Sequence, residues 1–333
     1  MMSLSLQMRR FVTLIQKGLS GLSQLLLQLL YSRKGQSQVY LGRPVSKRIP
    51  VSRIPRGSWD SHMHVVDPVK YPLAEDALYT PTPHLLSQAL LFEASTGIRN
   101  IVLVQPSIYG TDNSCLLDAL RTIGPRHGRA VVTFDCATID PSTLQKWHQW
   151  GVRGVRVNTQ SSGRHMDEDE LAATVRRYAD IIRPYNWVLQ LYVPLATAGV
   201  LERVVPELGV RVCFDHFGAP DLGGFGVLHR GDPYSLPGFR SLVNMLRRGN
   251  VYVKLSAPYR ISRDGTLRDL EPVARELLNV AGMTQMVFAS DWPHTRFEGL
   301  DIRPYMETLL TWCGGDEALI ERVFRGNAER LWE

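Results

Sequence analysis

Two histidines stand one residue apart in the stretch SWDSHMHVVDP, at the end of a short run that favours a β-strand. In a strand, residues i and i+2 project from the same face, so the rings of His62 and His64 would converge on one point. Such a pair suits a metal ion or a polarised carbonyl group. The alternative is a pair of surface histidines on a solvated strand face, and the tripeptide alone does not decide between the two.

Short apolar or β-branched runs alternate with amphipathic runs from about residue 58 onward, and no internal repeat is visible. Most of the apolar runs are nearly continuous, as expected for parallel strands that are buried on both faces. Eight strands alternating with helices over residues 59–333 predict a (β/α)8 TIM barrel, a single catalytic domain of the α/β class. A doubly wound open sheet is the alternative, but no G-x-G-x-x-G follows the first strand. The expected strands are 59–66, 100–107, 130–135, 152–158, 187–193, 210–218, 251–257 and 286–294, and the Gly- and Pro-rich segment 217–239 is expected to form a long loop.

Polar residues mark the ends of most of these strands. In TIM barrels the chemistry takes place at the C-terminal ends of the strands, so side chains there would meet at one mouth. Surface histidines would show no preference for strand ends, which favours the functional interpretation of the opening pair. The residues at these ends are His62, His64, Gln105, Ser107, Tyr109, Arg156, Asn158, Tyr192, Asp215, His216, Ser256, Tyr259, Arg260, Asp291 and His294.

Three motifs, DSHMHVVDP, FDHFGAPD and FASDWPH, fall on the first, sixth and eighth predicted strands and resemble the amidohydrolase superfamily. The stretches YTP, QPSIYGTDN, GVRGVRVN and SAPYR more narrowly resemble the 2-pyrone-4,6-dicarboxylate hydrolases and related lactonases. The resemblance runs from Trp59 to the C-terminal GNAERLW and implies a hydrolase that opens a carboxylated cyclic ester. A mononuclear zinc-dependent decarboxylase on the same barrel is the alternative, and a non-catalytic barrel tethered through its N-terminal segment is the third.

Opening a lactone requires that a water be deprotonated and that the carbonyl oxygen be stabilised as it gains charge. The resemblance makes Asp291 the base, which would later return the proton to the leaving oxygen. A free aspartate has a pKa near about 3.9 and is a poor base at neutral pH unless its surroundings raise that value. The alternative role for Asp291 is a helix N-cap. His62, His64 and His216 would polarise the carbonyl, directly or by holding a metal.

The metal requirement is left open by the sequence. Binuclear members of the superfamily use a lysine at the end of strand four and a histidine at the end of strand five. This chain has Asn158 and Tyr192 at those places, so a two-metal site is not expected. One zinc with an open coordination position could still be held by His62, His64, His216 and Asp291. The resembling pyrone hydrolases work without metal, whereas related decarboxylases keep one zinc, so we expect no cofactor or a single zinc.

Two arginines indicate an anionic small-molecule substrate. Guanidinium groups bind carboxylates through two parallel hydrogen bonds, and the resemblance places Arg156 and Arg260 against the substrate carboxylates. A salt bridge at a strand end is the alternative for Arg156. The resemblance also places Tyr79 and Ser107 at substrate-contact positions, and Tyr192 is expected to join them.

The chain departs from the resembling hydrolases at two places, which puts the identity of the substrate in doubt. Tyr109 stands where those hydrolases have a histidine, and Arg164 is only near the place of a further arginine. The remaining histidines show no strand-end placement and are expected to be structural or exposed, and two tryptophans are expected to pack a helix. These residues are His84, His127, His148, His165, His229, Trp147 and Trp150.

The net charge of +6 comes from the N-terminal segment. Ten basic and no acidic residues precede Asp60, which leaves 28 basic against 32 acidic residues in the remainder, so we expect no nucleic-acid partner. Residues 1–58 form a basic leader that is typical of a mitochondrial presequence. The alternatives for this segment are a secretory signal, an interfacial helix, a disordered segment or an incorrect start. The alternative location of the protein is the cytoplasm. The apolar run 22–30 is too short for a stable membrane span.

Four cysteines are widely spaced, without a C-x-x-C pair, which predicts a reducing compartment and no structural zinc. The oligomeric state does not follow from the sequence.

Overall fold

The computed structural model describes residues 53–163, 165–223 and 231–333. Eight parallel strands form one sheet in the order β1 to β8, so each strand pairs with its neighbours in the sequence. The predicted (β/α)8 barrel is confirmed. The strands are β1 (Trp59–Met63), β2 (Asn100–Val104), β3 (Gly128–Val132), β4 (Val152–Asn158), β5 (Val188–Tyr192), β6 (Val212–Phe214), β7 (Val251–Leu255) and β8 (Met286–Phe288).

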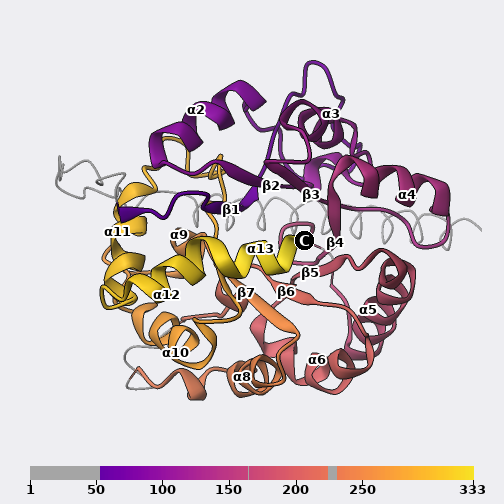
Figure 1. Cartoon of the computed structure of the whole chain (residues 1–333). Coiled ribbons are helices and arrows are strands. Elements are labelled where there is room, and N and C mark those ends of the chain that lie inside the picture. Colours follow the sequence, from indigo (N-terminus) through magenta and orange to yellow (C-terminus); the bar gives the residue numbers. More distant parts are fainter. Residues whose placement is uncertain (1–52, 164, 224–230) are drawn as a thin grey trace, which may run out of the picture. The chain divides into compact units, whose positions relative to one another are not determined.

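Helices follow the strands and surround the sheet (Figure 1). Helix α5 shows why: its buried residues recur at three and four, which forms one apolar stripe against the barrel. Asp167 caps its N-terminus by accepting from the backbone N–H of Glu170 at 2.8 Å. The helices are α2 (Leu86–Thr96), α3 (Ser114–Ile123), α4 (Pro141–Trp150), α5 (Glu168–Ile182), α6 (Ala198–Val204), α8 (Phe239–Arg247), α9 (Pro258–Ile261), α10 (Glu271–Ala281), α11 (Arg303–Trp312), α12 (Glu317–Glu321) and α13 (Asn327–Trp332).

The sheet closes on itself where β1 meets the chain that follows β8. The backbone N–H of Asp291 donates to the carbonyl of His62 at 2.9 Å, and that of His64 donates to the carbonyl of Trp292 at 2.8 Å. The two predicted functional segments, on the first and eighth strands, are therefore joined directly by backbone hydrogen bonds.

Helix α13 lies across the end of the barrel at which the strands begin (Figure 1). Trp332 is buried with residues from the interior of several strands, and its indole N–H donates to Ser61 Oγ at 3.1 Å. Its carbonyl accepts from Arg129 Nε, near the start of β3, at 2.9 Å. With this end covered, the opposite end is left for the chemistry.

Some sequence expectations differ from the structure in detail. Strands β1, β2 and β3 each end three residues before the predicted limit. Strands β6 and β8 end four and six residues before it, because the polar motifs that follow them turn away from the sheet. The predicted loop 217–239 contains a short 3-10 helix at Pro233–Ser235, and its residues 224–230 lie outside the described part. Most of the leader, residues 1–52, also lies outside it. Among the described residues, no helix is long and apolar enough to cross a bilayer.

Candidate active site

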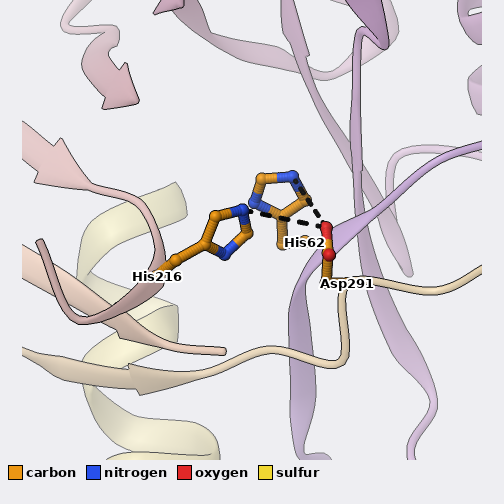
Figure 2. A group of neighbouring side chains, drawn as sticks. All are labelled: His62, His216 and Asp291. Carbon is orange, nitrogen blue, oxygen red and sulfur yellow. Dashed lines mark ion pairs between the residues drawn. The ribbon is translucent and has the colours of Figure 1, made fainter. Parts of the chain in front are cut away.

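Three imidazoles and one carboxylate meet at the C-terminal end of the barrel strands. Asp291 Oδ1 lies 3.7 Å from His62 Nε2 and 3.6 Å from His64 Nε2. The same oxygen lies 3.9 Å from His216 Nε2. Figure 2 shows the rings of His62 and His216 facing the Asp291 carboxylate from separate elements. The structure thus brings together four residues that the sequence spreads over three strand ends, and we name His62, His64, His216 and Asp291 the histidine–aspartate cluster.

The backbone leaves its strands sharply at two members of this cluster. His216 has φ +50° and Asp291 has φ +63°, a left-handed conformation that costs a residue with a Cβ on the order of 1 kcal/mol. Such strain gathers at functional sites because the surrounding fold must hold it. A second constraint comes from Asp60, whose Oδ1 accepts from the backbone N–H groups of His62 at 3.0 Å and Ser290 at 2.9 Å. Asp60 therefore links the first and last strands beneath the cluster.

The two oxygens of Asp291 have different surroundings. Oδ2 accepts from the Tyr259 hydroxyl at 2.6 Å and from Arg260 Nε at 2.7 Å, whereas Oδ1 faces the imidazoles. Burial by itself raises the pKa of Asp291, but the charge of Arg260 and the neighbouring imidazoles hold it well below its usual range. A base at neutral pH was expected to need a raised pKa, but the pKa of Asp291 is shifted in the opposite direction. Its cause is the pairing of Asp291 with Arg260.

Burial lowers the pKa of three histidines of the site, His62, His216 and His294. Burial, together with the nearby Lys254 ammonium, lowers the pKa of His62 well below its usual range. Burial likewise lowers the pKa of His216 to about 4, although Asp291 opposes the shift. His294, which packs edge-to-face on Tyr259, has its pKa lowered to about 4 by burial. Neutral rings can donate or accept a hydrogen bond, or bind a metal, depending on where each carries its proton.

Acidification should therefore destabilise the protein through His294. Because its folded-state pKa lies below the unfolded value near 6.5, the unfolded chain takes up the proton first, and stability is lost as the pH falls from about 6.5 to about 4. The expected loss is roughly 3 kcal/mol. Urea unfolding of the wild type and of His294→Phe, which keeps the ring, should show a steeper acid loss for the wild type. Equal slopes for the two proteins would contradict this.

A second, fully buried polar network lies behind His62. Asp215 Oδ2 accepts from Arg156 Nε at 3.1 Å, from Arg156 Nη2 at 3.0 Å and from Gln190 Nε2 at 3.0 Å. Lys254 Nζ donates to Gln190 Oε1 at 2.6 Å and lies 3.4 Å from Asp215 Oδ1. Burial raises the pKa of Asp215, but Lys254, His62 and Arg156 hold it well below its usual range. We name Asp215, Arg156, Gln190 and Lys254 the interior network.

The residues expected to contact substrate occupy two kinds of position. Arg156 belongs to the interior network, with a side chain 3% exposed, so the salt bridge that the sequence left as an alternative is present. The Arg260 side chain is 22% exposed. Its Nε donates to Asp291 Oδ2 and its Nη2 donates to the carbonyl of Thr295. The Tyr192 ring packs edge-to-face on His216 at 4.7 Å. Tyr79, with the Arg296 guanidinium 4.5 Å from its ring centre, is half-buried, as is Ser107, which accepts from Ser161 Oγ at 3.5 Å.

Six residues of the site were not assigned a role from the sequence. Asp215, Tyr259 and His294 stood among the strand-end residues without a function, and Asp60, Gln190 and Lys254 were not singled out. A signal was present for the last two, because each is a lone polar residue inside an otherwise apolar strand. Tyr109, by contrast, is buried and accepts from the backbone N–H of Asp67 at 2.9 Å, which is a structural role. Arg164 lies outside the described residues.

The other histidines within the described residues lie apart from the cluster. His84 pairs with Thr82, His127 with Asn100 and His148 with Trp187, and His165 is exposed. Trp147 and Trp150 of α4 line a surface groove of about 380 Å³ beside α3, to which no cluster residue contributes.

Three residues of the cluster, His62, His216 and Asp291, have ligand atoms close enough together to hold a single metal ion. Neighbouring ligands of a tetrahedral zinc with bonds of about 2.0–2.1 Å lie about 3.3–3.4 Å apart. The separations here are 3.3 Å between His62 Nε2 and His64 Nε2 and 3.6–3.9 Å from these rings and His216 to Asp291. The ligand atoms of His62, His216 and Asp291 all lie within 4.8 Å of one another. The geometry is therefore compatible with a metal, and the requirement depends on where the protons lie.

Comparison with known proteins places the chain in a family. The amidohydrolase family profile matches residues 59–333, so the chain belongs to the amidohydrolase family. Its relatives include a 4-sulfomuconolactone hydrolase from Rhizobium radiobacter, 30% identical over 303 residues that cover 87% of this chain and 94% of the relative. A 2-pyrone-4,6-dicarboxylate hydrolase from Comamonas testosteroni is 30% identical over 258 residues, 74% of this chain and 79% of that one.

A solved structure described as a "putative 2-pyrone-4,6-dicarboxylic acid hydrolase" from Pseudomonas putida is similar in fold. Its TM-score is 0.70 at 28% identity, over 84% of this chain and 98% of that one. These relatives are bacterial proteins and give the mitochondrial interpretation of residues 1–58 no support, so that interpretation stays a prediction from the sequence.

Proposed function

We propose that this protein is a hydrolase that opens a carboxylated cyclic ester, of the lactone or 2-pyrone type. The observation that carries the proposal is the convergence of His62, His64 and His216 on one oxygen of Asp291. The curated relatives named above support it, because both are named for the hydrolysis of such rings. The decarboxylase alternative is not favoured by these relatives.

The geometry suggests how the ring opens. A water that hydrogen-bonds to Asp291 Oδ1 would give up a proton to this oxygen as its own oxygen attacks the ester carbon. An imidazole N–H stabilises the carbonyl oxygen as it becomes negative. When the intermediate collapses, the bond to the ring oxygen breaks and Asp291 returns the proton to that leaving oxygen. The products are one carboxylic acid, which loses its proton to solvent and becomes a carboxylate, and one hydroxyl or its keto form. The enzyme regains its starting charge.

A metal, if one is bound, would be held by His62, His64, His216 and Asp291, and it would supply Lewis acidity at the ester carbonyl. In both cases Asp60 keeps the first and last strands in register, and the interior network fixes His62 from behind.

Arg260 connects substrate binding with the reaction. Its guanidinium is the partly exposed cation at the cluster, and it is paired with the Asp291 oxygen that faces away from the imidazoles. A substrate carboxylate that attracts this guanidinium would weaken its hold on Asp291, which would make the aspartate a stronger base only when an anionic ring is present. Selectivity for anionic substrates follows from this arrangement.

The proposed function is tested with a panel of lactones and pyrones, with and without carboxylate groups, assayed before and after chelator treatment. The proposal expects ring-opened acids from the carboxylated members. Release of CO2 together with stoichiometric zinc would support the decarboxylase instead.

Replacing Arg260 with methionine should raise the KM for a carboxylated lactone by about 10-fold or more, since a charge-assisted hydrogen-bonded pair contributes about 1.5–3 kcal/mol. The KM for an uncharged lactone should change little. The control is Arg263→Met, because the Arg263 side chain is 65% exposed and pairs only with Asp221 among the described residues. An equal rise in KM for charged and uncharged rings would contradict the assignment of Arg260.

A further inference from the structure

Lys254 is the deepest cation of the site and contacts the cluster directly. It lies on β7 with a fully buried side chain, and its Nζ is 3.3 Å from His62 Nδ1. On the other side it lies 5.3 Å from the centre of the Trp332 ring, which closes the barrel. The ammonium therefore stands between the floor of the barrel and the first imidazole of the cluster.

The direction of the hydrogen bond between Lys254 and His62 determines which ring nitrogen of His62 carries the hydrogen. A charged lysine has three donors and no lone pair. In its hydrogen bond with His62, Lys254 must therefore donate, and Nδ1 must accept. A neutral imidazole that accepts at Nδ1 carries its hydrogen on Nε2.

The opposite end of the cluster gives the same answer independently. His64 Nδ1 lies 2.8 Å from the carbonyl oxygen of Val104, which can only accept, so Nδ1 of His64 carries a hydrogen. In a neutral His64 ring, Nε2 then carries a lone pair, and it lies 3.3 Å from His62 Nε2. A hydrogen bond across this contact needs the hydrogen on His62 Nε2, and it is lost if that hydrogen moves to Nδ1.

We propose that Lys254 is a positioning residue that holds the proton of His62 on Nε2, where it serves as a hydrogen-bond donor to the ester carbonyl rather than as a metal ligand. Without substrate, hydrogen bonds then run from Lys254 to His62, from His62 to His64 and from His64 to the backbone of Val104. A bound ester carbonyl would replace His64 Nε2 as the acceptor of the His62 hydrogen. The donor role rests on the proposed function, whereas the position of the proton does not.

The structure also holds the partner that the other tautomer would need. Asp215 Oδ1 lies 3.3 Å from His62 Nδ1, without the geometry of a hydrogen bond, and has no hydrogen-bond partner among the described residues. If the proton of His62 moved to Nδ1, this oxygen would accept it, and Nε2 would become free to bind zinc. A carboxylate behind the ring is the common partner of a metal-binding histidine. Lys254 and Asp215 thus favour opposite states of one imidazole.

Removing the lysine should move the balance toward zinc. In Lys254→Met, a side chain of similar length without a donor, Asp215 keeps its two bonds from Arg156 and one from Gln190. We expect the full-length variant, stripped with chelator, to bind zinc about 10–100-fold more tightly than the wild type in competition with a chromophoric chelator. Cys213→Ala is the control, because Cys213 is buried on the neighbouring strand beside Lys254 and has no bond to His62.

The proton itself can be observed without catalysis. In ¹⁵N-histidine spectra of the metal-free wild type, with His62 assigned by comparison with His62→Gln, the hydrogen is expected on Nε2, and in Lys254→Met it is expected on Nδ1. A hydrogen on Nδ1 in the wild type would overturn the proposal even if the variant does not fold. Unchanged or weaker zinc affinity in a folded Lys254→Met would also overturn it. Both readouts are independent of any substrate, so they stand apart from failure of the lactonase assay.

Discussion

Asp291→Asn is expected to lower kcat on a carboxylated lactone by about 10²–10⁴-fold, the range usual for loss of a general acid–base group. The introduced amide would keep an acceptor for the Tyr259 hydroxyl and Arg260, which at present donate to Asp291 at 2.6 and 2.7 Å, so the fold and the KM should change little. The oxygen that would receive the proton from water is lost. Among the described residues, the other carboxylate paired with a cluster imidazole is Asp215, which lies 3.3 Å from His62 Nδ1. Steady-state kinetics with the lactone identified in the panel measures the effect.

The control for this substitution is Asp301→Asn. The Asp301 side chain is 48% exposed and pairs with Arg303 at 2.8 Å, and it has no hydrogen bond or ion pair with a residue of the cluster. It should retain the wild-type kcat. If Asp291→Asn keeps more than a tenth of the wild-type kcat, Asp291 is not the base, and one of the imidazoles becomes the candidate.

Asp215→Leu is expected to have the largest effect on stability. The substitution leaves the buried cations Arg156 and Lys254 without their carboxylate, and removing one partner of a buried ion pair costs about 3–5 kcal/mol. Urea unfolding at pH 7 measures the difference in the free energy of unfolding. In Asp301→Ala, where the pair is exposed, the loss should stay below about 1 kcal/mol.

The wild type and Asp215→Leu should also differ in how their stability changes at low pH. Because the folded-state pKa of Asp215 lies below the unfolded value near 3.9, its stabilising contribution is complete above that pH and is lost as the pH falls through the folded-state value. The wild type should therefore lose stability more steeply than Asp215→Leu below about pH 4. A loss for Asp215→Leu at pH 7 no larger than that of Asp301→Ala would show that the interior network is not needed for stability.

The barrel could be predicted because its signal is repeated along the chain. Apolar strands and amphipathic helices alternate many times, so one wrongly assigned segment does not change the predicted fold. The range 152–158 of β4 was predicted without error. The ends of β6 and β8 could not be predicted, because FDHFG and FASDWPH read as extended, yet His216 and Asp291 adopt left-handed backbone conformations. Turns of this kind leave no periodic pattern of apolar residues in the sequence, so the ends of these strands could not be located from it.

The site was predicted as a set of strand ends, but not in its electrostatics. The tight turn at Ala257, with φ +49°, brings Tyr259 and Arg260 onto Asp291, and spacing in the sequence contains no sign of that contact. For this reason the low pKa of Asp291 was not foreseen. Lys254 was missed because one polar residue in an apolar strand can also mark an exposed edge, and only the closed barrel makes it interior.

A crystal structure of Asp291→Asn soaked with a carboxylated lactone tests the central claim most directly. We expect the ring to lie at the cluster, with its carbonyl oxygen within hydrogen-bond distance of His62 Nε2, its carboxylate on Arg260 and its ester carbon facing the substituted side chain. A lactone found instead in the groove beside Trp147 and Trp150, with the cluster unchanged, would contradict the assignment of the cluster as the place where the ring is opened.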